Sequence, residues 1–305
     1  MGRYIGRRFL FAIVMLLVAT IFLFVLSRSA GDPRFLYLSE DTTPEIWEEW
    51  GRQMGLDRPL IVQYGSWLGN AIRGDFGNSL WFKRDAFEIV RERAPATLQL
   101  AGAAFAFSMI VAIPLGVLSA VSRGSVWDYI GRVFALLGQT MPGFWLGIIL
   151  IMAFSVQIDL FPISRRAGWT ALILPTITLG WFPAAGMLRL VRSSMLEVLD
   201  TEFVKFARAK GVSHTKLIWK HAFRNALIAP LTYASLLLAG LVTGAVVTET
   251  VFAWPGLGRL GVQAVNNNDF PLMAAVVVLT AVAYIGANLL IDVAYVFIDP
   301  RIKYS

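Results

Sequence analysis

The chain has 305 residues, of which 57% are hydrophobic and 15% are charged. Soluble domains carry roughly 45–50% apolar and about 25% charged residues, so this composition excludes an ordinary soluble domain and predicts an integral membrane protein. The formal net charge of +7 would suit a nucleic-acid binder, but no basic and aromatic surface motif accompanies it, and no nucleic-acid partner is expected.

The first predicted element is an apolar helix near the N-terminus. Arg3, Arg7 and Arg8 precede the apolar run 9–26, an arrangement that imitates a secretory signal. The run is about 18 residues long, which exceeds the roughly 7–15 residues of a signal core and approaches the length that spans hydrocarbon. Residues 1–27 are therefore predicted to form an uncleaved signal-anchor helix, with cleavage after Ser29 as the alternative.

Residues 28–96 are predicted to form an extracytoplasmic loop subdomain. Helix-like spacing recurs in 45–54 and 60–72, and Pro44 stands where a helix would begin. We expect two or three short helices here. Two roles remain open: a lid that shields the mouth of a pore, or contact with a soluble protein that delivers substrate.

Five more segments are long and apolar enough to cross a bilayer as helices. They are 97–121, 129–156, 171–191, 231–251 and 272–297. With the first helix they predict an all-α integral membrane protein with six transmembrane helices. Residues 97–297 would form a five-helix core, and residues 298–305 a short tail.

The distribution of basic residues predicts the orientation of the chain. Two short loops, 157–170 and 252–271, contain only three basic residues, which are Arg165, Arg166 and Arg259. The remaining flanks are richer in Lys and Arg, and the insert 192–228 is the most basic of them. The positive-inside rule therefore places both termini and the insert in the cytoplasm.

The sequence lacks the motifs of a self-sufficient enzyme or pump. It has no cysteine, no G-x-x-x-x-G-K-[ST] phosphate loop, no H-E-x-x-H and no nucleophile elbow. His214 and His221 have no metal-site pattern around them. No catalytic residue, metal or cofactor is predicted.

Charges inside the predicted spans are scarce. Asp292 is interpreted as a structural hydrogen-bonding group between helices. Glu249 is a possible gate or substrate contact, with anchoring of the following loop as the alternative. A charge at mid-bilayer costs roughly 2.5–3.5 kcal/mol, which coupled carriers accept at their ion sites. Because so few charges lie in the predicted spans, no ion-coupling site is expected, and the energy for any transport would come from outside this chain.

The insert 192–228 is the most informative segment. Phe203, Phe206, Ala207 and Lys210 follow i, i+3, i+4, i+7 spacing, which predicts a short helix with two aromatic side chains on one face. Basic residues would lie around the flanks of this helix: Lys205, Arg208 and Lys210. Gly211 is a natural stop, and 215–226 is a second helical piece. The helix could lie on the membrane surface or dock into a groove on a soluble partner.

Motifs spread along the whole chain carry a family resemblance. They are Gly74-Asp75-Phe76-Gly77-Asn78-Ser79, Ala94-Pro95-Ala96-Thr97-Leu98, Met141-Pro142-Gly143-Phe144-Trp145-Leu146-Gly147, Ala207-Arg208-Ala209-Lys210-Gly211, Arg224-Asn225-Ala226-Leu227-Ile228, Thr248-Glu249-Thr250-Val251-Phe252, Trp254-Pro255-Gly256-Leu257-Gly258-Arg259 and Asp299-Pro300-Arg301. Taken in order, they resemble the inner-membrane permease subunits of the oligopeptide/dipeptide/nickel class of ATP-binding-cassette importers.

The resemblance implies that the insert forms a coupling helix, which docks into a cleft of an ATPase subunit. The family signature is E-A-A, three residues, then G. Aligned on Gly211, it falls on Lys205, Phe206 and Ala207, so only the last Ala is kept. The residues implied to transmit motion are Phe203, Phe206, Ala207, Arg208, Lys210 and Gly211.

The resemblance also implies partners and a mechanism. It implies a multi-pass protein of the inner membrane, surrounded by lipid, that pairs with a second permease subunit. Two ATP-hydrolysing subunits would dock on the cytoplasmic side, and a binding protein would deliver solute from outside. Di- or oligopeptides are the expected substrate, with oligosaccharides, nickel chelates or glutathione as alternatives. A self-sufficient secondary carrier would predict inverted repeats and a buried charged coupling pair, and neither is visible.

Overall fold

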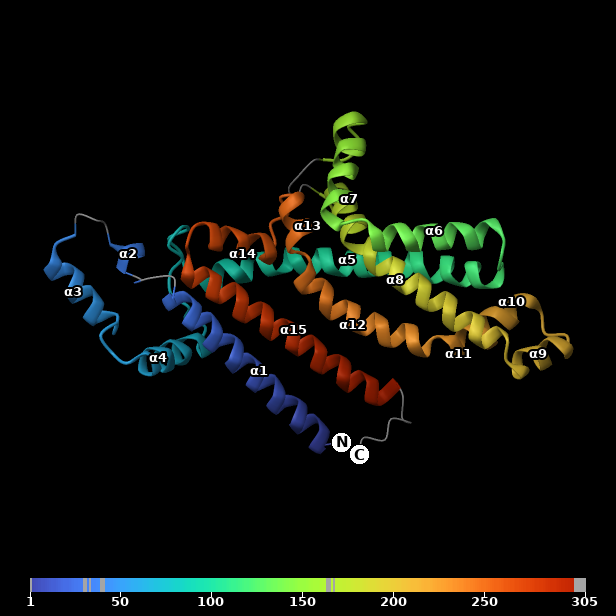
Figure 1. Ribbon diagram of the computed structural model, residues 1–305, viewed down its shortest axis with the longest axis horizontal. Coiled ribbons are helices and arrows are strands. Elements are labelled where there is room, and N and C mark those ends of the chain that lie inside the picture. The colour runs from blue at the N-terminus through green and yellow to red at the C-terminus, as the bar shows by residue number, and fades with distance from the viewer. Residues whose placement is uncertain are drawn as a thin grey trace. The chain divides into compact units, whose positions relative to one another are not determined.

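The structure is a computed structural model that describes residues 2–29, 32, 34–38, 42–162, 166 and 168–298. The chain divides into two compact units, and Figure 1 labels most of the helices of both. Unit 1 comprises Met1–Pro95 and Gly256–Ser305, and unit 2 comprises Ala96–Pro255. The described elements are helices, apart from an isolated antiparallel bridge between Asn78 and Asp85. The predicted all-α fold is therefore confirmed.

Unit 1 is built on long helices from the two ends of the chain. Helix α1 (Gly2–Ser29) contacts α15 (Phe270–Ile298), and α15 also contacts α14 (Leu257–Asn266). Helix α5 (Ala86–Val121) begins in this unit and ends in unit 2. The buried core of unit 1 joins the start of α5 to α14 and α15 through Ile89, Val90, Leu260 and Leu272.

The segment that follows α1 contains the short helices predicted from its spacing. They are α2 (Arg34–Tyr37), α3 (Pro44–Gln53) and α4 (Leu60–Ile72). Pro44 is the first residue of α3, as predicted, and Thr43 before it is extended. Proline suits this position because its fixed φ is helical and the first N–H groups of a helix have no intrahelical acceptor.

Asp269 connects the loop after α4 to the start of α15. Its Oδ1 accepts a hydrogen bond from the Leu272 N–H at 3.2 Å, which makes Asp269 the N-cap of α15. Its Oδ2 accepts from the Ser79 hydroxyl and, at 3.1 Å, from the Trp81 N–H. Both Asp269 and Ser79 are buried. This contact gives a structural reason for the polar residue that ends the Gly74–Ser79 motif.

Unit 2 is organised around one long helix, α8 (Ile173–Leu199). Around it lie α6 (Val126–Thr140), α7 (Gly143–Leu150) and α12 (Ile228–Gly244), each in contact with α8. The remaining elements of the apolar part are η1 (Ile151–Gln157), η2 (Thr170–Leu172) and α13 (Val246–Val251). Met187, Leu188, Val191 and Met195 of α8 are almost fully buried and form the centre of the main hydrophobic cluster.

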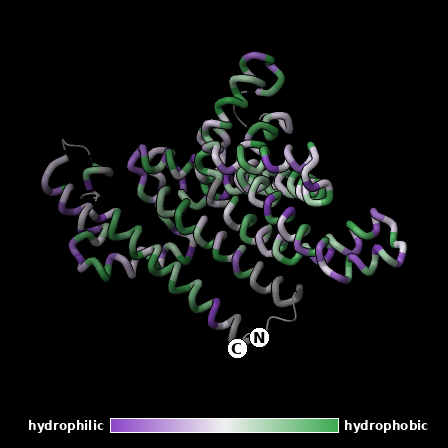
Figure 2. Tube along the Cα trace, turned by 45° about the vertical axis from the view of Figure 1, so that its right-hand side comes forward, coloured by the Kyte–Doolittle hydropathy of each residue, from purple (hydrophilic) through white to green (hydrophobic). Residues whose placement is uncertain are grey.

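Four helices in the described residues are long and apolar enough to span a membrane. They are Gly6–Ser29, Ala86–Val121, Thr170–Leu199 and Phe270–Leu289. The predicted span 231–251 corresponds to α12 and α13, within which the described apolar stretch Ile228–Leu238 is shorter than a span. Figure 2 shows hydrophobic residues along almost the whole of α1.

The predicted span 129–156 is not one straight helix. It consists of α6 and the α7–η1 pair, bent by 109° at a short break. Met141 at the break is extended, with ψ of 124°, and Pro142 follows it. Proline cannot donate a helical hydrogen bond, and it disfavours the helical conformation of the residue before it. Counting the bent pair as one span gives five candidates in the part of the chain that the structure describes.

Candidate functional site: the insert between α8 and α12

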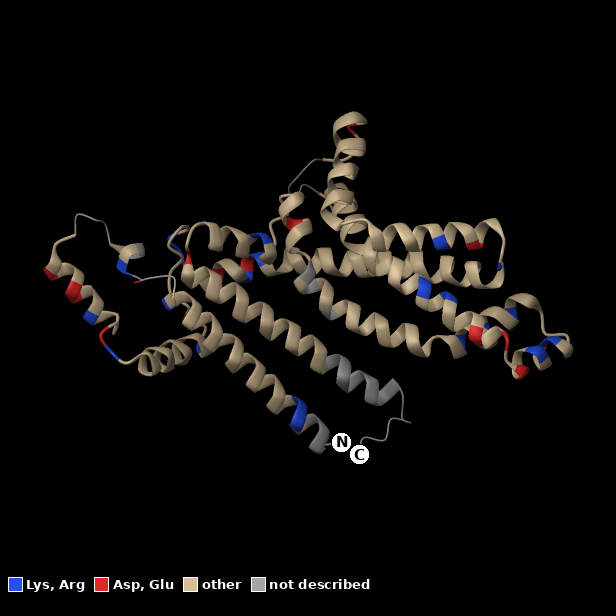
Figure 3. Cartoon of the chain, viewed as in Figure 1, with Lys and Arg blue, Asp and Glu red and all other residues tan. Residues whose placement is uncertain are grey.

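The insert folds into the two helical pieces predicted from the sequence. The first is α9 (Glu202–Ala209). The second is a run of α10 (His214–Lys216), the π-helical η3 (Leu217–Phe223) and α11 (Arg224–Ala226). Figure 3 shows that Lys and Arg gather over α9 and the adjoining end of α8, whereas α12 carries few charges.

The insert is seated on the C-terminal half of α8. Ile218, Ala222 and Ala226 are buried in the same hydrophobic cluster as Met195. Helix α9 contacts both α8 and η3, and its Val204 side chain is 0% exposed. Val204 is the anchor of α9, although the sequence pattern singled out its aromatic neighbours instead. Because α9 and η3 pack against α8, a movement of α8 would move these helices with it.

The face of α9 opposite Val204 is aromatic and exposed. Phe203 is 45% exposed and Phe206 is 61% exposed. Lys210 lies with its Nζ 4.5 Å from the centroid of the Phe206 ring, a cation–π contact. The structure thus brings these three predicted residues together on one face. A hydrophobic exposed face on a short helix is suited to insertion into a groove on another protein.

The other predicted residues of α9 lie around this face. Ala207 is half-buried at its edge. Arg208 follows Val204 by four residues, so it lies on the side of the helix away from the aromatic rings. Lys205 pairs with Glu202 through an Nζ–Oε1 distance of 2.9 Å, and this hydrogen bond raises the pKa of Lys205. Both charges are exposed, so the pair orients side chains and contributes little to stability.

Gly211 ends α9 in a left-handed conformation, with φ of +78°. The Val212 N–H donates to the Ala207 carbonyl at 3.3 Å, and the Gly211 N–H donates to the Arg208 carbonyl at 3.0 Å. These two bonds form a Schellman motif, in which the left-handed residue is usually glycine. A Cβ atom on Gly211 would meet nothing within 4 Å. Glycine is therefore needed here for the backbone turn, as predicted, and the space beside it is open.

A buried carboxylate joins α8 to α5 and α6. Asp128 of α6 is 2% exposed, and its Oδ1 accepts hydrogen bonds from the Ser119 hydroxyl at 2.7 Å and from Arg192 Nε at 2.9 Å. Its Oδ2 accepts from the Gly124 N–H at 3.0 Å. The cluster links the end of α5, the α5–α6 turn, α6 and α8. Sequence reasoning missed it, although Ser125 and Asp128 have the spacing of a helix N-terminus.

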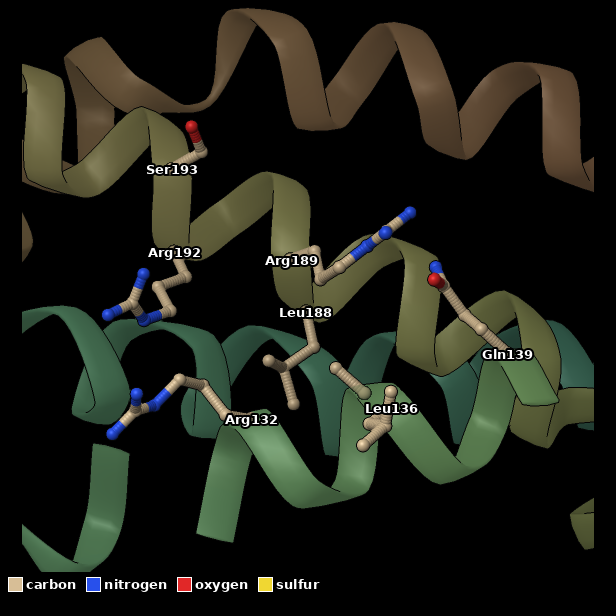
Figure 4. Close-up of a pocket in the computed structure, with 8 residues that line it drawn as sticks. Arg132, Leu136, Gln139, Leu188, Arg189, Arg192 and Ser193 are labelled. Atoms are coloured by element: carbon tan, nitrogen blue, oxygen red, sulfur yellow. The ribbon is translucent and has the colours of Figure 1, made fainter. Parts of the chain in front are cut away.

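A basic groove of about 420 Å³ lies beside this cluster, between α6 and α8 (Figure 4). Leu136 and Leu188 line its apolar part. Arg132 and Arg192 extend toward the same side of the groove, whereas Arg189 extends the other way, toward Gln139. Arg132 is more distant from the buried carboxylate than Arg192, with Nε 3.7 Å from Asp128 Oδ1.

Glu249 lies away from the insert, at a different place in unit 2. Its side chain is 0% exposed, and Oε1 accepts a hydrogen bond from the Thr97 hydroxyl at 2.6 Å. In the turn that follows α13, the Trp254 N–H donates to the Glu249 carbonyl at 2.8 Å, and Trp254 Nε1 donates to the Ala96 carbonyl at 2.9 Å. This geometry favours the anchoring role for Glu249, and its role as a gate or substrate contact stays a prediction.

Some predicted features lie outside what the structure describes. These are the side chain of Asp292, residue Arg165, and the tail beyond residue 298 with the Asp299-Pro300-Arg301 motif. Within the described residues, no group of three or more His, Asp or Glu side chains is placed to hold a metal ion.

Comparisons with known proteins identify the chain by family. Residues 112–304 match the family described as "Binding-protein-dependent transport system inner membrane component", and residues 1–101 match its N-terminal counterpart. A putative peptide transport system permease protein of Brucella abortus (strain 2308) is 38% identical over 300 residues, which cover 96% of each chain. The oligopeptide transport system permease protein AppB of Bacillus subtilis (strain 168) is 37% identical over 100% of each chain.

A third relative and two solved structures agree with this result. The glutathione transport system permease protein GsiC of Escherichia coli (strain K12) is 36% identical over 100% of each chain. A chain of the inward-facing MetNI methionine ABC transporter has a TM-score of 0.53 at 22% identity, covering 68% of this chain and 96% of that one. A chain of an amino acid ABC transporter has a TM-score of 0.55 at 13% identity, covering 68% of this chain and 92% of that one. These two structures support the fold alone. The resemblance drawn from the motifs is confirmed, and the chain belongs to the family of inner-membrane components of binding-protein-dependent transport systems.

Proposed function

We propose that this chain is one of two permease subunits of an ATP-driven importer whose cargo is di- or oligopeptides. The single observation that carries the coupling part is the geometry of α9. Val204 holds the helix against α8 and η3, while Phe203 and Phe206 stay exposed on the opposite face. An ATPase subunit with an apolar cleft would cover those rings.

The proposed partners follow from this surface and from the family. A second permease subunit would complete the translocation path, two ATPase subunits would each receive a coupling helix, and an extracytoplasmic binding protein would deliver the peptide. Peptides are favoured because relatives named for peptide and oligopeptide transport cover nearly the whole chain. Glutathione, itself a small peptide, is the second candidate, because a relative named for it covers all of the chain.

The orientation is part of the proposal. Of the arginines in the groove, Arg132 lies in the N-terminal half of α6, and Arg189 and Arg192 lie in the C-terminal half of α8, the half that the basic insert follows. Under the positive-inside rule the start of α6, the end of α8 and the insert face the cytoplasm, and so do both termini. Dimerisation of the ATPases on ATP would push α9 and, through its seat, α8. The spans would then switch between inward-open and outward-open states, a two-state change that ATP biases.

The test is substrate-stimulated ATP hydrolysis by the complete importer in lipid. Ala207→Asp places a charge at the edge of the aromatic face, and Gly211→Arg places a large side chain in the open space beside the turn. Both should reduce peptide-stimulated turnover sharply. Phe203→Ser together with Phe206→Ser should weaken retention of the ATPase in pull-down. Phe35→Ser in α2, where Phe35 is 72% exposed, is the matched control for pull-down and should leave retention of the ATPase unchanged. Wild-type turnover in the α9 variants would refute the coupling assignment.

A further inference from the structure

The groove between α6 and α8 carries more positive charge than its buried carboxylate balances. Three arginines line it, and no Asp or Glu is among the described residues of its lining. Asp128, beside the groove, pairs with Arg192 and lies 3.7 Å from Arg132. Arg189 has no ion-pair partner in the part of the chain that the structure describes. One carboxylate therefore stands against three guanidinium groups.

The arginines lie where α6 and α8 reach one boundary of the membrane. The apolar helix Thr170–Leu199 has 30 residues, about ten more than a helix needs to cross hydrocarbon. Counted from its first residue, Arg189 is the twentieth, so the arginines of α8 fall where the crossing is complete. On α6, the exposed rings of Trp127 and Tyr129 stand five and three residues before Arg132. Trp and Tyr are enriched at the membrane–water interface, which supports the same level for the groove.

Positive charge and apolar surface follow each other along one face of α6. Arg132 and Leu136 are four residues apart, so they lie on the same face, and Leu136 is 63% exposed. Figure 4 shows the Arg132 and Arg192 side chains extending together toward the start of α6, with Leu136 further along the groove. The groove thus has a cationic end at the membrane boundary and an apolar wall one turn deeper. That order complements an amphiphile with an anionic head and a hydrocarbon tail.

The unused donors at the cationic end suit a phosphate group. Arg192 uses Nε and Nη2 for Asp128. Arg132 is exposed and uses only Nε, which donates to the Asp128 carbonyl at 3.4 Å. The other guanidinium nitrogens of both arginines have no partner among the described residues. Guanidinium groups bind phosphate oxygens through paired N–H bonds, and the cytoplasmic leaflet is rich in anionic phospholipid.

We propose that this groove binds an anionic phospholipid of the cytoplasmic leaflet, with the lipid phosphate at Arg132 and Arg192 and one acyl chain against Leu136. The inference goes beyond the proposed function and rests on it only for the orientation, which places this boundary at the cytoplasm. A lipid held by both helices would add to the pair between Asp128 and Arg192 in fixing α6 to α8. The stability of unit 2 would then depend on the charge of the surrounding bilayer.

Arg132→Gln is the sharpest test, because it removes the more exposed of the two arginines. Native mass spectrometry of the delipidated permease–ATPase complex measures binding of dioleoylphosphatidylglycerol. The variant should raise the Kd of the first bound lipid roughly fivefold, the contribution of one arginine near a membrane surface. Arg123→Gln is the matched control and should change this Kd less than about twofold. Arg123 is exposed in the α5–α6 turn, outside the groove, so the same charge is lost nearby. Without lipid, both variants should keep the thermal midpoint of the wild type.

A change of lipid provides the second arm. Dioleoylphosphatidylethanolamine has the same chains and a phosphate but no net charge, and it should bind the wild-type complex more weakly than the anionic lipid. Glycerophosphoglycerol, the anionic head without acyl chains, should not displace the lipid, which separates a lipid site from a site for soluble phosphate.

Three results would overturn the proposal. The first is equal binding of the two lipids by the wild-type complex, and the second is an equal loss of binding in Arg123→Gln and Arg132→Gln. The third is release of the second permease subunit from the Arg132→Gln complex with lipid binding unchanged, which would make the groove a subunit interface. Each rejects the lipid site and leaves the proposed function standing, whereas absence of peptide-stimulated ATP hydrolysis would reject the function itself.

Discussion

Arg192 on α8 and Asp128 on α6 form an ion pair, with Nε 2.9 Å from Oδ1, at a point where the carboxylate is almost completely buried. The same carboxylate also holds a hydroxyl of α5 and a backbone N–H of the α5–α6 turn. Arg192 lies ten residues before Glu202, the first residue of α9. The pair therefore fixes α8, which carries the insert, to the two helices beside it.

Asp128→Asn should destabilise unit 2, because it leaves the Arg192 guanidinium without its counter-charge. Removing one partner of a buried pair costs roughly 3–5 kcal/mol. The Arg192 side chain is 24% exposed and can be partly hydrated. We therefore expect the free energy of unfolding to fall by about 2 kcal/mol. The thermal midpoint in detergent measures the effect. Arg132→Gln, which removes the exposed and more distant arginine, is the control and should cost less than about 0.5 kcal/mol. Equal effects of the two changes would contradict the role given to the buried pair.

Gly211→Ala and Ala253→Gly should change stability in opposite directions. Both positions are left-handed, with φ of +78° and +49°. The Ala253 turn has the same pair of bonds as the Gly211 turn, from the Ala253 N–H to Thr250 and from the Trp254 N–H to Glu249. The left-handed conformation costs a residue with a Cβ about 1 kcal/mol. Thermal unfolding should therefore show that Gly211→Ala lowers the stability by about 1 kcal/mol and that Ala253→Gly raises it by up to about 1 kcal/mol.

A second control separates strain from coupling. Gly124 also has positive φ, +79°, and open space around its Cβ position. Gly124→Ala should match Gly211→Ala in added backbone strain. Only the change at 211 should alter the amount of ATP hydrolysed per peptide imported. An equal change in that ratio at both positions would show that strain alone is responsible.

Asp269→Asn should loosen the loop that contains the Gly74–Ser79 motif. The substitution weakens the N-cap of α15 and the contacts to Ser79 and Trp81. Hydrogen bonds to a charged group are worth about 1.5–3 kcal/mol, and a helix cap about 1 kcal/mol. We therefore expect faster proteolysis of the loop and a loss of about 2 kcal/mol in the free energy of unfolding. Asp75→Asn is the control. Asp75 is exposed and accepts from the Gly77 N–H within its own turn, and its loss should leave the proteolysis rate unchanged.

Gly138→Ala should disrupt the crossing of α6 and α8. A Cβ atom on Gly138 would collide with the Cβ of Ala185 and approach Trp181 Nε1 to 3.0 Å. Small residues let membrane helices approach closely, and overpacking such a contact costs about 1–3 kcal/mol. Gly102→Ala on α5 is the matched control, because a Cβ there meets nothing within 4 Å. It should be neutral or stabilising by up to about 1 kcal/mol, as helix propensity predicts. A thermal midpoint for Gly138→Ala no lower than that of the control would reject the close crossing.

The sequence alone determined the class of the molecule, most of its helices and the position of the candidate coupling helix. These features depend on local chemistry. Apolar length predicts spans, Pro44 marks a helix start, and the spacing of Phe203 and Phe206 together with Gly211 defines a short amphipathic helix and its end. Each is visible within one or two turns of chain, so a linear reading can recover it.

Only the tertiary structure decided which residues hold these helices in place and which stay free to bind. Asp128 meets Arg192 across 64 positions of sequence, and Ser79 meets Asp269 across 190. No local pattern records such a pairing, because it arises when helices fold back on one another. Proline at 142 could be read as an interruption, but the 109° bend appears only when the packing of α7 against α8 and α13 is known.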